Sequence, residues 1–286
     1  MERWTVLRIL KWTANYFFER GIDGPRLDAE LLLAEALDLD RVGLYLNYDR
    51  PLKDTELDRF RDYVRRRVNH EPVQYILGCT EFWSLNLRVD SRVLIPRADT
   101  EVLVEEALAS AQDGPLRILD VGTGSGAISI ALASERPNWQ FTAIDVCPHA
   151  LALASHNSEQ HGLKERIRFM EADLSELPEG PFDLIVSNPP YIPASDWDGL
   201  MAEVRDHEPR LALVGGTDGL DAYRLLTAQV EQGLVCGGGL LVEVGIGQAS
   251  QVAELFRFAG LIQIDQRKDY AGIPRVVKGV RKPHDG

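Results

Sequence analysis

Cysteine is scarce in this sequence, and its spacing excludes two common ways of stabilising a small fold. Only three of the 286 residues are cysteines, at Cys79, Cys147 and Cys236. They are odd in number, widely separated and form no C-x-x-C pair, so neither a disulfide framework nor a zinc site is expected. We expect buried, reduced thiols and no bound metal.

Positive charge and long apolar runs are also lacking. The chain has 31 lysine and arginine residues against 44 aspartate and glutamate residues, a formal net charge of −13. This acidity argues against broad binding of duplex DNA, because neutralising phosphates requires clustered basic side chains. No apolar run approaches the ~18 residues of a transmembrane helix, and Arg8 interrupts the N-terminal stretch that a signal peptide would need. The sequence predicts a cytoplasmic globular protein without membrane association or stable nucleic acid binding.

Residues 1–75 have the pattern of helices. Pro25 suits a first helical turn, and apolar residues follow at spacings of three and four, namely Leu27, Leu31, Ala34 and Leu37. A second amphipathic helix is expected over residues 54–68, with an apolar side made of Leu57, Phe60, Val64 and Val68. Its other side carries a basic cluster of Arg59, Arg61, Arg65, Arg66 and Arg67. Either a solvated face or contact with an acidic or RNA-rich partner explains this cluster.

The rest of the chain changes to strand patterns. Residues 79–96 alternate between apolar and polar side chains and predict a β-hairpin, with Asp90-Ser91 between its apolar sets. A helix is expected over residues 99–111. Short apolar runs then alternate with helical segments, which is typical of a mainly parallel sheet covered on both faces. Seven strands are expected, at residues 116–121, 140–144, 167–170, 182–186, 240–244, 262–265 and 275–280.

A glycine-rich turn follows the first of these seven strands. It reads Asp120-Val121-Gly122-Thr123-Gly124-Ser125-Gly126 and leads into a predicted helix over residues 127–135. Glycine allows a tight turn and close approach of a ligand, and the helix N-terminus offers free N–H groups. Asp145 ends the next strand, where a carboxylate can accept hydrogen bonds from both hydroxyls of a ribose. The context predicts a nucleotide-type ligand.

Two acidic residues favour S-adenosylmethionine over a dinucleotide as that ligand. With Ala127 the turn also satisfies the G-x-G-x-x-A pattern, so the turn alone leaves NAD open. Asp120 stands where the ammonium group of S-adenosylmethionine needs an acidic neighbour, whereas a pyrophosphate gains nothing from a carboxylate. Asp173, just after the third strand, can accept a hydrogen bond from an adenine amino group.

The fourth strand of the sheet runs into the tetrad Asn188-Pro189-Pro190-Tyr191. Ligands of open α/β sheets bind outside the carboxyl ends of the strands, so the tetrad and the glycine turn should face one crevice. An amide or exocyclic amine is a poor nucleophile, and the Asn188 side-chain carbonyl and Pro189 backbone carbonyl can hold its N–H groups toward a methyl donor. Tyr191 offers a flat face to a planar group. The tetrad predicts methyl transfer to nitrogen, with Asn188, Pro189 and Tyr191 as catalytic residues.

Together these motifs resemble those of class I S-adenosylmethionine-dependent methyltransferases acting on planar nitrogen. Four further segments resemble the HemK/PrmC family of release-factor glutamine methyltransferases over nearly the whole chain, namely residues 71–78, 94–97, 100–101 and 218–220. The resemblance implies a seven-stranded Rossmann-like catalytic domain at 97–286, a hairpin connector at 79–96 and a helical substrate-docking domain at 1–78. The acceptor it implies is the glutamine of the Gly-Gly-Gln motif of peptide chain release factors.

The resemblance also assigns site residues. Gly122 to Gly126, Asp145, Asp173 and Leu174 would line the cofactor site, with Asn188 beside them, and Asn188 to Tyr191 would hold the glutamine amide. One departure is visible, because the family's Arg-Pro-Glu-Thr-Glu reads Arg97-Ala98-Asp99-Thr100-Glu101 here. We expect it to affect only the start of the following helix.

Three alternative functions stay open at this point. A sister enzyme that methylates a glutamine of a large-subunit ribosomal protein shares the tetrad, although residues 74–78 and 100–101 favour the release-factor branch. A DNA adenine methyltransferase would need a target-recognition segment and a basic groove, which the net charge of −13 disfavours. A regulator that binds S-adenosylmethionine without catalysis would have no need of a complete tetrad.

Overall fold

The structure is a computed structural model that describes residues 4–110 and 114–283. The chain divides into two compact units. The smaller, the helical unit, comprises the described residues up to Cys79 together with Met201–His207, and the larger, the sheet unit, comprises the rest. The sequence places residues 201–207 in the catalytic domain, and here they return to the helical unit.

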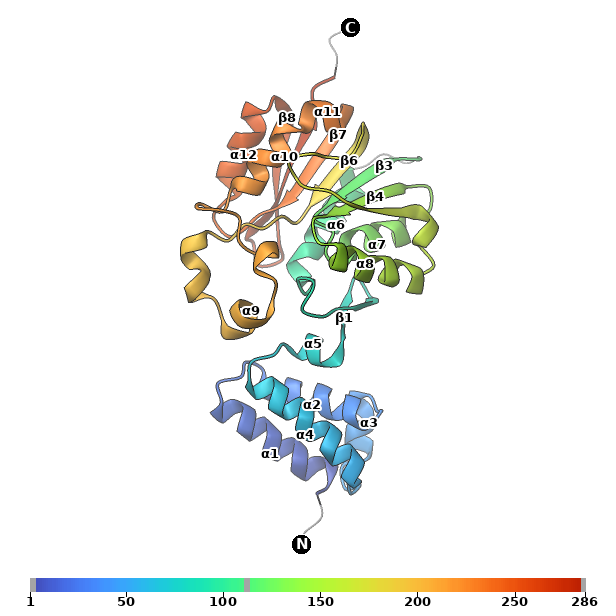
Figure 1. Ribbon diagram of the computed structural model, residues 1–286, viewed down its shortest axis with the longest axis vertical. Coiled ribbons are helices and arrows are strands. Elements are labelled where there is room, and N and C mark those ends of the chain that lie inside the picture. Colours follow the sequence, from blue (N-terminus) through green and yellow to red (C-terminus); the bar gives the residue numbers. More distant parts are fainter. Residues whose placement is uncertain (1–3, 111–113, 284–286) are drawn as a thin grey trace. The chain divides into compact units, whose positions relative to one another are not determined.

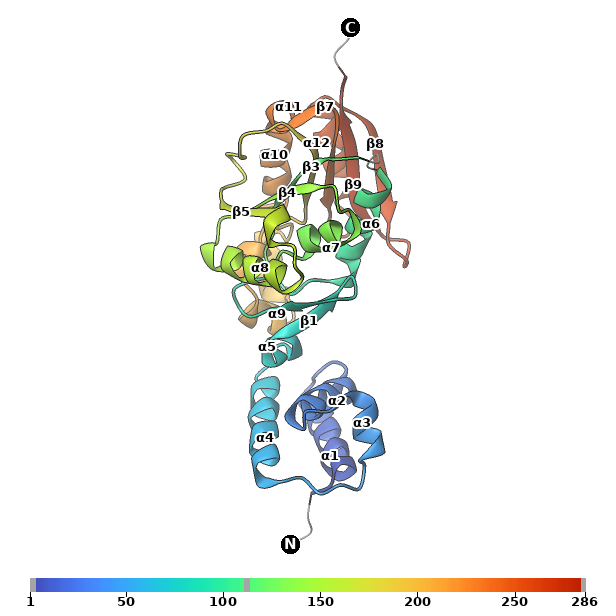
Figure 2. The same ribbon diagram turned by 90° about the vertical axis from the view of Figure 1, so that its right-hand side faces the viewer.

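The helical unit is built around a single apolar core. Its helices are α1 (Val6–Glu19), α2 (Pro25–Ala36), α3 (Arg41–Leu46), α4 (Asp54–Val68), α5 (Val73–Leu77) and the later α9 (Ala202–His207). Helices α1, α2 and α4 lie side by side (Figure 2) and enclose Phe17, Leu32, Leu33 and Phe60. The apolar side predicted for α4 is confirmed, because Leu57, Phe60 and Val64 are buried and Val68 packs against them.

The apolar side predicted for α2 is wrong in part. Leu27 is 46% exposed, whereas Ala29 and Leu32 are fully buried. Two acidic residues share the buried side: Asp28 accepts a hydrogen bond from Arg67, and Glu30 accepts hydrogen bonds from Arg41, Arg26 and Tyr45. Because paired carboxylates occupy core-facing positions, the apolar period of this helix is hidden in the sequence.

The basic cluster of α4 is paired with carboxylates inside the helical unit. Arg59, Arg61, Arg65 and Arg66 form ion pairs with Glu35, Asp58, Asp62 and Glu71, respectively. Arg67 is not on a solvated face, because it is 3% exposed and bridges Asp28 and Glu203 at 2.6 and 2.7 Å. The cluster therefore carries much less free positive charge than its sequence suggests.

The predicted hairpin exists, but its turn lies elsewhere. Strands β1 (Cys79–Phe82) and β2 (Leu85–Arg88) pair through a turn at Trp83-Ser84, not at Asp90-Ser91. Both turn residues have positive φ, 53° and 57°, a conformation that Asn-Gly usually signals in a sequence. Trp-Ser carries no such signal, and the apolar residues Val93 and Ile95 are buried without forming a strand.

The sheet unit contains a seven-stranded sheet of order β5-β4-β3-β6-β7-β9-β8. Its strands are β3 (Arg117–Val121), β4 (Gln140–Asp145), β5 (Ile167–Glu171), β6 (Phe182–Ser187), β7 (Leu234–Glu243), β8 (Leu261–Lys268) and β9 (Pro274–Arg281). Neighbours are parallel except that β9 runs antiparallel to both β7 and β8. All seven predicted strands are confirmed, with β7 beginning at Leu234 instead of Leu240.

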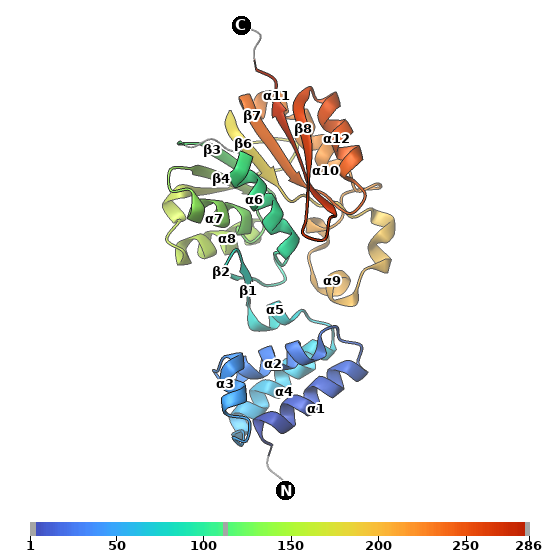
Figure 3. The same cartoon turned by 180° about the vertical axis from the view of Figure 1, so that it is seen from behind.

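Helices cover both faces of this sheet (Figures 1 and 3). Its helices are α6 (Glu101–Ser110), α7 (Ala127–Glu135), α8 (Pro148–Gln160), α10 (Asp221–Ala228), α11 (Val230–Gly233) and α12 (Ala249–Phe258). Short 3-10 turns lie at η1 (Ala98–Thr100), η2 (Lys164–Arg166), η3 (Ala194–Gly199) and η4 (Arg210–Ala212). Successive residues of a strand alternate between two cores, so Ile118 packs with α6 and α7 while Leu119 packs with α10 and α12.

The cysteines are free thiols, but the prediction that they are buried is wrong. Cys79 and Cys147 are half-buried and Cys236 is exposed. Cys236 lies in the irregular part of β7, where its register with β6 shifts between Phe182 and Leu184. Among the helices that the structure describes, none has the length and apolar character needed to cross a membrane.

Candidate functional site

A cavity of about 220 Å³ lies at the carboxyl ends of β3, β4, β5 and β6. The strand order reverses around β3, which is where open α/β sheets bind their ligands. The cavity brings together most residues that the sequence singled out, namely Gly122, Gly124, Asp145, Asp173, Leu174, Asn188 and Pro190. Other parts of the cavity wall come from two segments, with Arg92, Val93 and Leu94 in one and Pro209, Leu211 and Ala212 in the other. The sequence did not predict these residues, because they do not stand at strand ends.

The glycines of the turn have two different structural roles. Gly122 and Gly124 line the cavity with φ of 71° and 55°, and a Cβ built on either would meet no atom within 4 Å. Gly126 has φ of 82°, and its Cβ would lie 3.0 Å from Ile130 Cδ1 and 3.1 Å from Ala154 Cβ. The first two glycines therefore leave open space beside the backbone, and the third permits close packing of α7 against α8.

Asp120 is buried beneath the turn and does not line the cavity. Its Oδ2 accepts hydrogen bonds from the hydroxyls of Thr123, at 2.7 Å, and Ser129. Its Oδ1 is buried without a hydrogen-bond partner among the described residues. Burial raises the pKa of this carboxyl from 3.8 to about 6, against the two hydroxyls, which lower it. Thr123 and Ser125 are also buried behind the cavity wall.

Asp145 joins the end of β4 to the glycine turn. Its Oδ2 accepts a hydrogen bond from the backbone N–H of Gly124 and its Oδ1 one from that of Cys147, both at 2.9 Å. Each carboxylate oxygen has a further lone pair, so the side chain can still accept from a ligand. Asp173 lines the cavity, and hydrogen bonds from the hydroxyl and backbone N–H of Ser175 lower its pKa.

The tetrad lies where β6 ends. Asn188 lines the cavity and donates from its Nδ2 to the Thr100 hydroxyl at 3.1 Å. Pro190 also lines the cavity, whereas Pro189 is buried. The Tyr191 ring packs against the core that contains α10 and α12, and burial raises its pKa to about 12. Of the four residues of the tetrad, Pro189 and Tyr191 therefore do not form part of the cavity wall.

Two glycines of a later loop pack closely against the backbone of the tetrad. A Cβ on Gly215 would lie 2.3 Å from the Pro190 carbonyl oxygen, and one on Gly219 would lie 2.2 Å from that of Tyr191. Gln248 donates to the same Tyr191 carbonyl at 2.9 Å. This close approach gives a physical reason for the Asp218-Gly219-Leu220 segment that the sequence singled out.

The segment that departs from the family pattern forms a charged contact. Ala98–Thr100 form the 3-10 turn η1, and Asp99 Oδ2 lies 2.8 Å from Arg275 Nη2. Near this pair lies Glu243, a buried acid at the end of β7 that the motifs of the sequence did not single out. The one signal that marks it is an acidic residue within the apolar run of residues 240–244.

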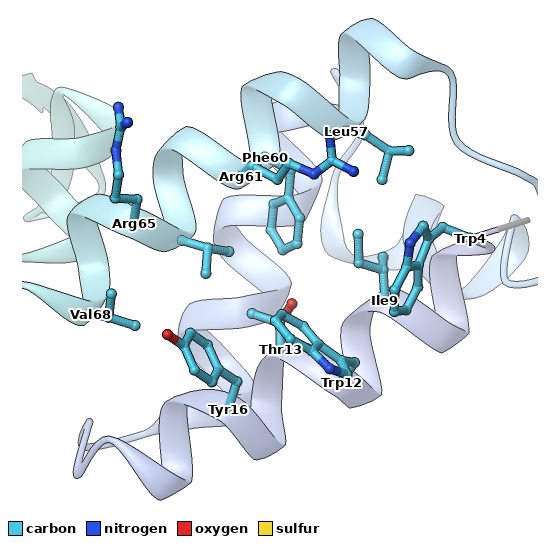
Figure 4. Close-up of a pocket in the computed structure, with 11 residues that line it drawn as sticks. Trp4, Ile9, Trp12, Thr13, Tyr16, Leu57, Phe60, Arg61, Arg65 and Val68 are labelled. Carbon is cyan, nitrogen blue, oxygen red and sulfur yellow. The ribbon is translucent and has the colours of Figure 1, made fainter.

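A second cavity, of about 300 Å³, lies within the helical unit between α1 and α4 (Figure 4). Aromatic rings dominate one side: Trp12 stacks on Tyr16 at 5.1 Å, and Trp4 meets Trp12 edge-on at 6.1 Å. Arg61 and Arg65 line the other side together with apolar residues of α4. Because none of the described residues that line it is acidic, this aromatic groove offers a contact surface but no acid–base chemistry.

The sheet order, the glycine turn after β3 and the Asn-Pro-Pro-Tyr tetrad after β6 define a class I methyltransferase. A family model described as "Methyltransferase domain" matches residues 118–207, and one described as "PrmC N-terminal domain" matches residues 8–78. The chain belongs to the release factor glutamine methyltransferase family. It is 49% identical over 279 residues to the release factor glutamine methyltransferase of Geobacter sulfurreducens, which covers 97% of each chain.

One further relative agrees with this assignment, and one solved structure agrees with the fold. The release factor glutamine methyltransferase of Chlorobaculum tepidum is 44% identical over 284 residues, or 95% of this chain and 96% of that one. A solved methyltransferase from Pyrococcus furiosus shares the fold at 18% identity, with a TM-score of 0.51 over 69% of this chain and 89% of that one. The family and fold class predicted from the sequence are confirmed.

Proposed function

We propose that this protein transfers a methyl group from S-adenosylmethionine to the side-chain amide nitrogen of the glutamine in the Gly-Gly-Gln motif of peptide chain release factors. The observation that supports this most is that Asn188 and Pro190 border the same cavity as Gly122, Gly124 and Asp145. A release factor as substrate also fits a cytoplasmic location. As proposed, the reaction requires no metal and no stable contact with nucleic acid.

The cavity fits the proposed methyl donor. The open space beside Gly122 and Gly124 lets a ligand lie against the backbone, and Asp145 retains lone pairs for the two ribose hydroxyls. Asp173 would accept from the adenine amino group, with Leu174 beside the ring. Asp120, Thr123, Ser125 and Gly126 would shape the turn from behind. When bound, S-adenosylmethionine supplies an activated methyl group on a sulfonium.

The tetrad would orient the acceptor. Because Asn188 Nδ2 is engaged by Thr100, its Oδ1 is the atom left to accept an N–H from the substrate amide, and the Pro189 carbonyl would accept the other. The amide nitrogen gains the N–C bond as the S–C bond breaks, and one amide proton leaves to water. Holding both N–H groups favours the positive charge that develops on nitrogen. Tyr191, packed into the core, would fix the tetrad in place.

One labelling experiment tests the substrate. The protein is incubated with methyl-labelled S-adenosylmethionine and, separately, with a purified release factor, large-subunit ribosomal proteins and DNA. Mass spectrometry then locates the label. We expect it on the glutamine of the Gly-Gly-Gln motif, and label on a ribosomal protein alone would replace the release factor as substrate.

Replacing Asn188 by alanine tests the role of the tetrad. We expect kcat to fall about 100-fold, because one of two acceptors for the amide is lost, while the Kd for S-adenosylmethionine changes little. Stopped assays at saturating substrates and calorimetry measure the two constants. A near-normal kcat in a folded Asn188→Ala protein would remove Asn188 from the mechanism.

We further propose that the helical unit docks the release factor through the aromatic groove, with residues 1–78 as the docking domain, joined by Met201–His207, 79–96 as its connector and the rest of 97–286 as the catalytic domain. Trp12 is 50% exposed at the groove, and exposed aromatic residues commonly dominate protein interfaces. Trp12→Ser should raise the KM for the release factor about 10-fold and leave kcat unchanged. Phe18→Ser is the matched control, because Phe18 is 74% exposed on the same helix but outside the groove.

A further inference from the structure

Glu243 is a buried acid placed next to the tetrad by the sheet. Strands β6 and β7 are parallel neighbours, and Ser187 lies opposite Val242. Asn188 follows Ser187 and Glu243 follows Val242, so Asn188 and Glu243 lie next to each other at the carboxyl ends of adjacent strands. Glu243 is 1% exposed, and its Oε2 has no hydrogen-bond partner within the part of the chain that the structure describes.

The surroundings of Glu243 connect it to Asn188 directly and through Thr100. Burial raises the pKa of the Glu243 carboxyl from 4.5 to about 7, while hydrogen bonds from Thr100 and Asn188 and the charge of Arg275 oppose the rise. Thr100 is 4% exposed, and its hydroxyl also accepts from Asn188 Nδ2 at 3.1 Å. Three polar side chains therefore share one network, with Asn188 in the cavity wall and Thr100 and Glu243 buried behind it.

This network determines which end of the Asn188 amide faces the cavity. A carboxamide has two N–H donors on one end and an acceptor oxygen on the other. With its nitrogen directed to Thr100 and Glu243, its oxygen is the end available to a ligand. The flipped amide would set its oxygen against the Glu243 carboxyl and its N–H groups toward the N–H groups of a substrate, which leaves buried partners unpaired.

We propose that Glu243 is a positioning residue that, together with Thr100, fixes the orientation of the Asn188 amide and so makes Asn188 an acceptor for the substrate N–H. The inference rests on the proposed role of Asn188 in holding the glutamine amide. Glu243 does not line the cavity, so it acts through Asn188 and not on the substrate itself.

An exchange of charge between the two positions tests this contact. Asn188→Asp places two carboxyls side by side, which repel when both are ionised and otherwise share a proton that engages the introduced carboxyl with Glu243, so we expect kcat to fall about 100-fold. Adding Glu243→Gln supplies an amide donor to the introduced carboxylate and leaves one of its oxygens for the substrate. We expect the double variant to recover about 10-fold of the kcat lost in Asn188→Asp, a coupling that contacting residues can show. A double variant no faster than Asn188→Asp overturns the proposal.

Thr100→Val gives a second, independent measurement in case the variants of Glu243 fold poorly. It keeps the β-branched shape and removes the hydroxyl, and we expect kcat to fall about 10-fold with the Kd for S-adenosylmethionine within about twofold of the parent. Thr227→Val is the matched control, because Thr227 is also buried and its hydroxyl donates to carbonyls of α10. Equal kcat in the Thr100 and Thr227 variants would contradict the proposal.

A buried glutamate outside the site controls for stability. Glu106 is 8% exposed and pairs with Lys278 at 2.6 Å, so Glu106→Gln should lower the melting temperature but not kcat.

Asn188→Ala separates this inference from the proposed function. If Asn188→Ala is fully active, the role of the tetrad fails. If it is inactive while Thr100→Val behaves as the parent and the double variant is no faster than Asn188→Asp, only the positioning role fails.

Discussion

Asp145 is the single residue on which cofactor binding should depend most. Its two oxygens already hold the backbone N–H groups of Gly124 and Cys147, so its loss removes a ligand contact and also loosens the turn. Asp145→Ala should raise the Kd for S-adenosylmethionine by about 10–100-fold, because hydrogen bonds to a charged group contribute about 1.5–3 kcal/mol. Isothermal titration calorimetry measures this constant.

Asp183→Ala provides the control for that measurement. Asp183 also accepts a backbone N–H, that of Arg117, at 2.7 Å, but it lies near the start of β6 and does not line the cavity. Its variant should bind S-adenosylmethionine normally. An unchanged Kd in Asp145→Ala would place the ribose elsewhere in the cavity.

Among single residues, the sequence predicted the site residues that stand at strand ends. It did not predict the contacts of residues that reach the site through tertiary packing. Gly122, Asp145 and Asn188 follow directly from the strand–turn pattern. Thr100 is distant along the chain, and its contact with Asn188 depends on how η1 and α6 pack against the sheet. Asp120 stands at the predicted strand end, but hydroxyls of the turn and of α7 engage its Oδ2, which no local pattern indicates.

Among the helices, the contact between α2, α4 and α9 through Arg67 should be costly to break, because it pairs buried charges. Arg67 and Asp28 are both buried, and burial raises the pKa of Asp28 despite the arginine beside it. Arg67→Met would leave that carboxyl without its partner and should lower the free energy of unfolding by about 3–5 kcal/mol. Hydrogen exchange of the amides of α1, α2 and α4 reports this loss.

A second arginine of α4 gives the matched control. Arg65 pairs with Asp62 on the surface, with 75% of its side chain exposed. Arg65→Met should therefore change the free energy of unfolding by less than about 1 kcal/mol. Equal effects of the two substitutions would mean that the buried ion pair contributes no more than an exposed one.

The sequence predicted some secondary-structure elements better than others, and each difference has a physical reason. The seven strands were found because strands covered on both faces read as continuous apolar runs. The hairpin turn was misplaced because Trp83-Ser84 adopts positive φ without glycine or asparagine. The sequence did not predict the return of α9 to the helical unit, because its contacts there, such as the pair of Glu203 with Arg67, join residues far apart in the chain.

Across the whole molecule, the acidity of the chain coexists with extensive internal pairing. The net charge of −13 disfavoured a DNA-binding surface, yet five arginines on one helix suggested an exception. Each of the five has a carboxylate partner, so the exception disappears in the folded chain. Net charge disfavoured one class of substrate, duplex DNA, but the location of free charge depended on the tertiary structure.

Two buried carboxyls give the molecule a stability that decreases toward neutral pH. Burial raises the pKa of Glu243 from 4.5 to about 7 and that of Asp120 from 3.8 to about 6. Between the ordinary and the raised value, the native state keeps a proton that the unfolded chain has released. The contribution of each group is therefore complete below its ordinary pKa and is lost as the pH rises through the raised one.

Glu243→Gln should remove the larger of these two effects, because glutamine resembles the protonated acid at every pH. The groups that face Glu243 are Thr100, Asn188, Arg275 and Asp99, and the variant leaves them all in place. Urea denaturation is measured at pH values from about 4.5 to about 8. As the pH rises over this range, the free energy of unfolding of the variant should increase relative to that of the parent by up to about 3 kcal/mol. Carboxylates with lowered pKa, such as Asp218 and Asp269, act at lower pH and cancel in this comparison. Parallel curves for the two proteins would show that Glu243 does not hold its proton in the native state.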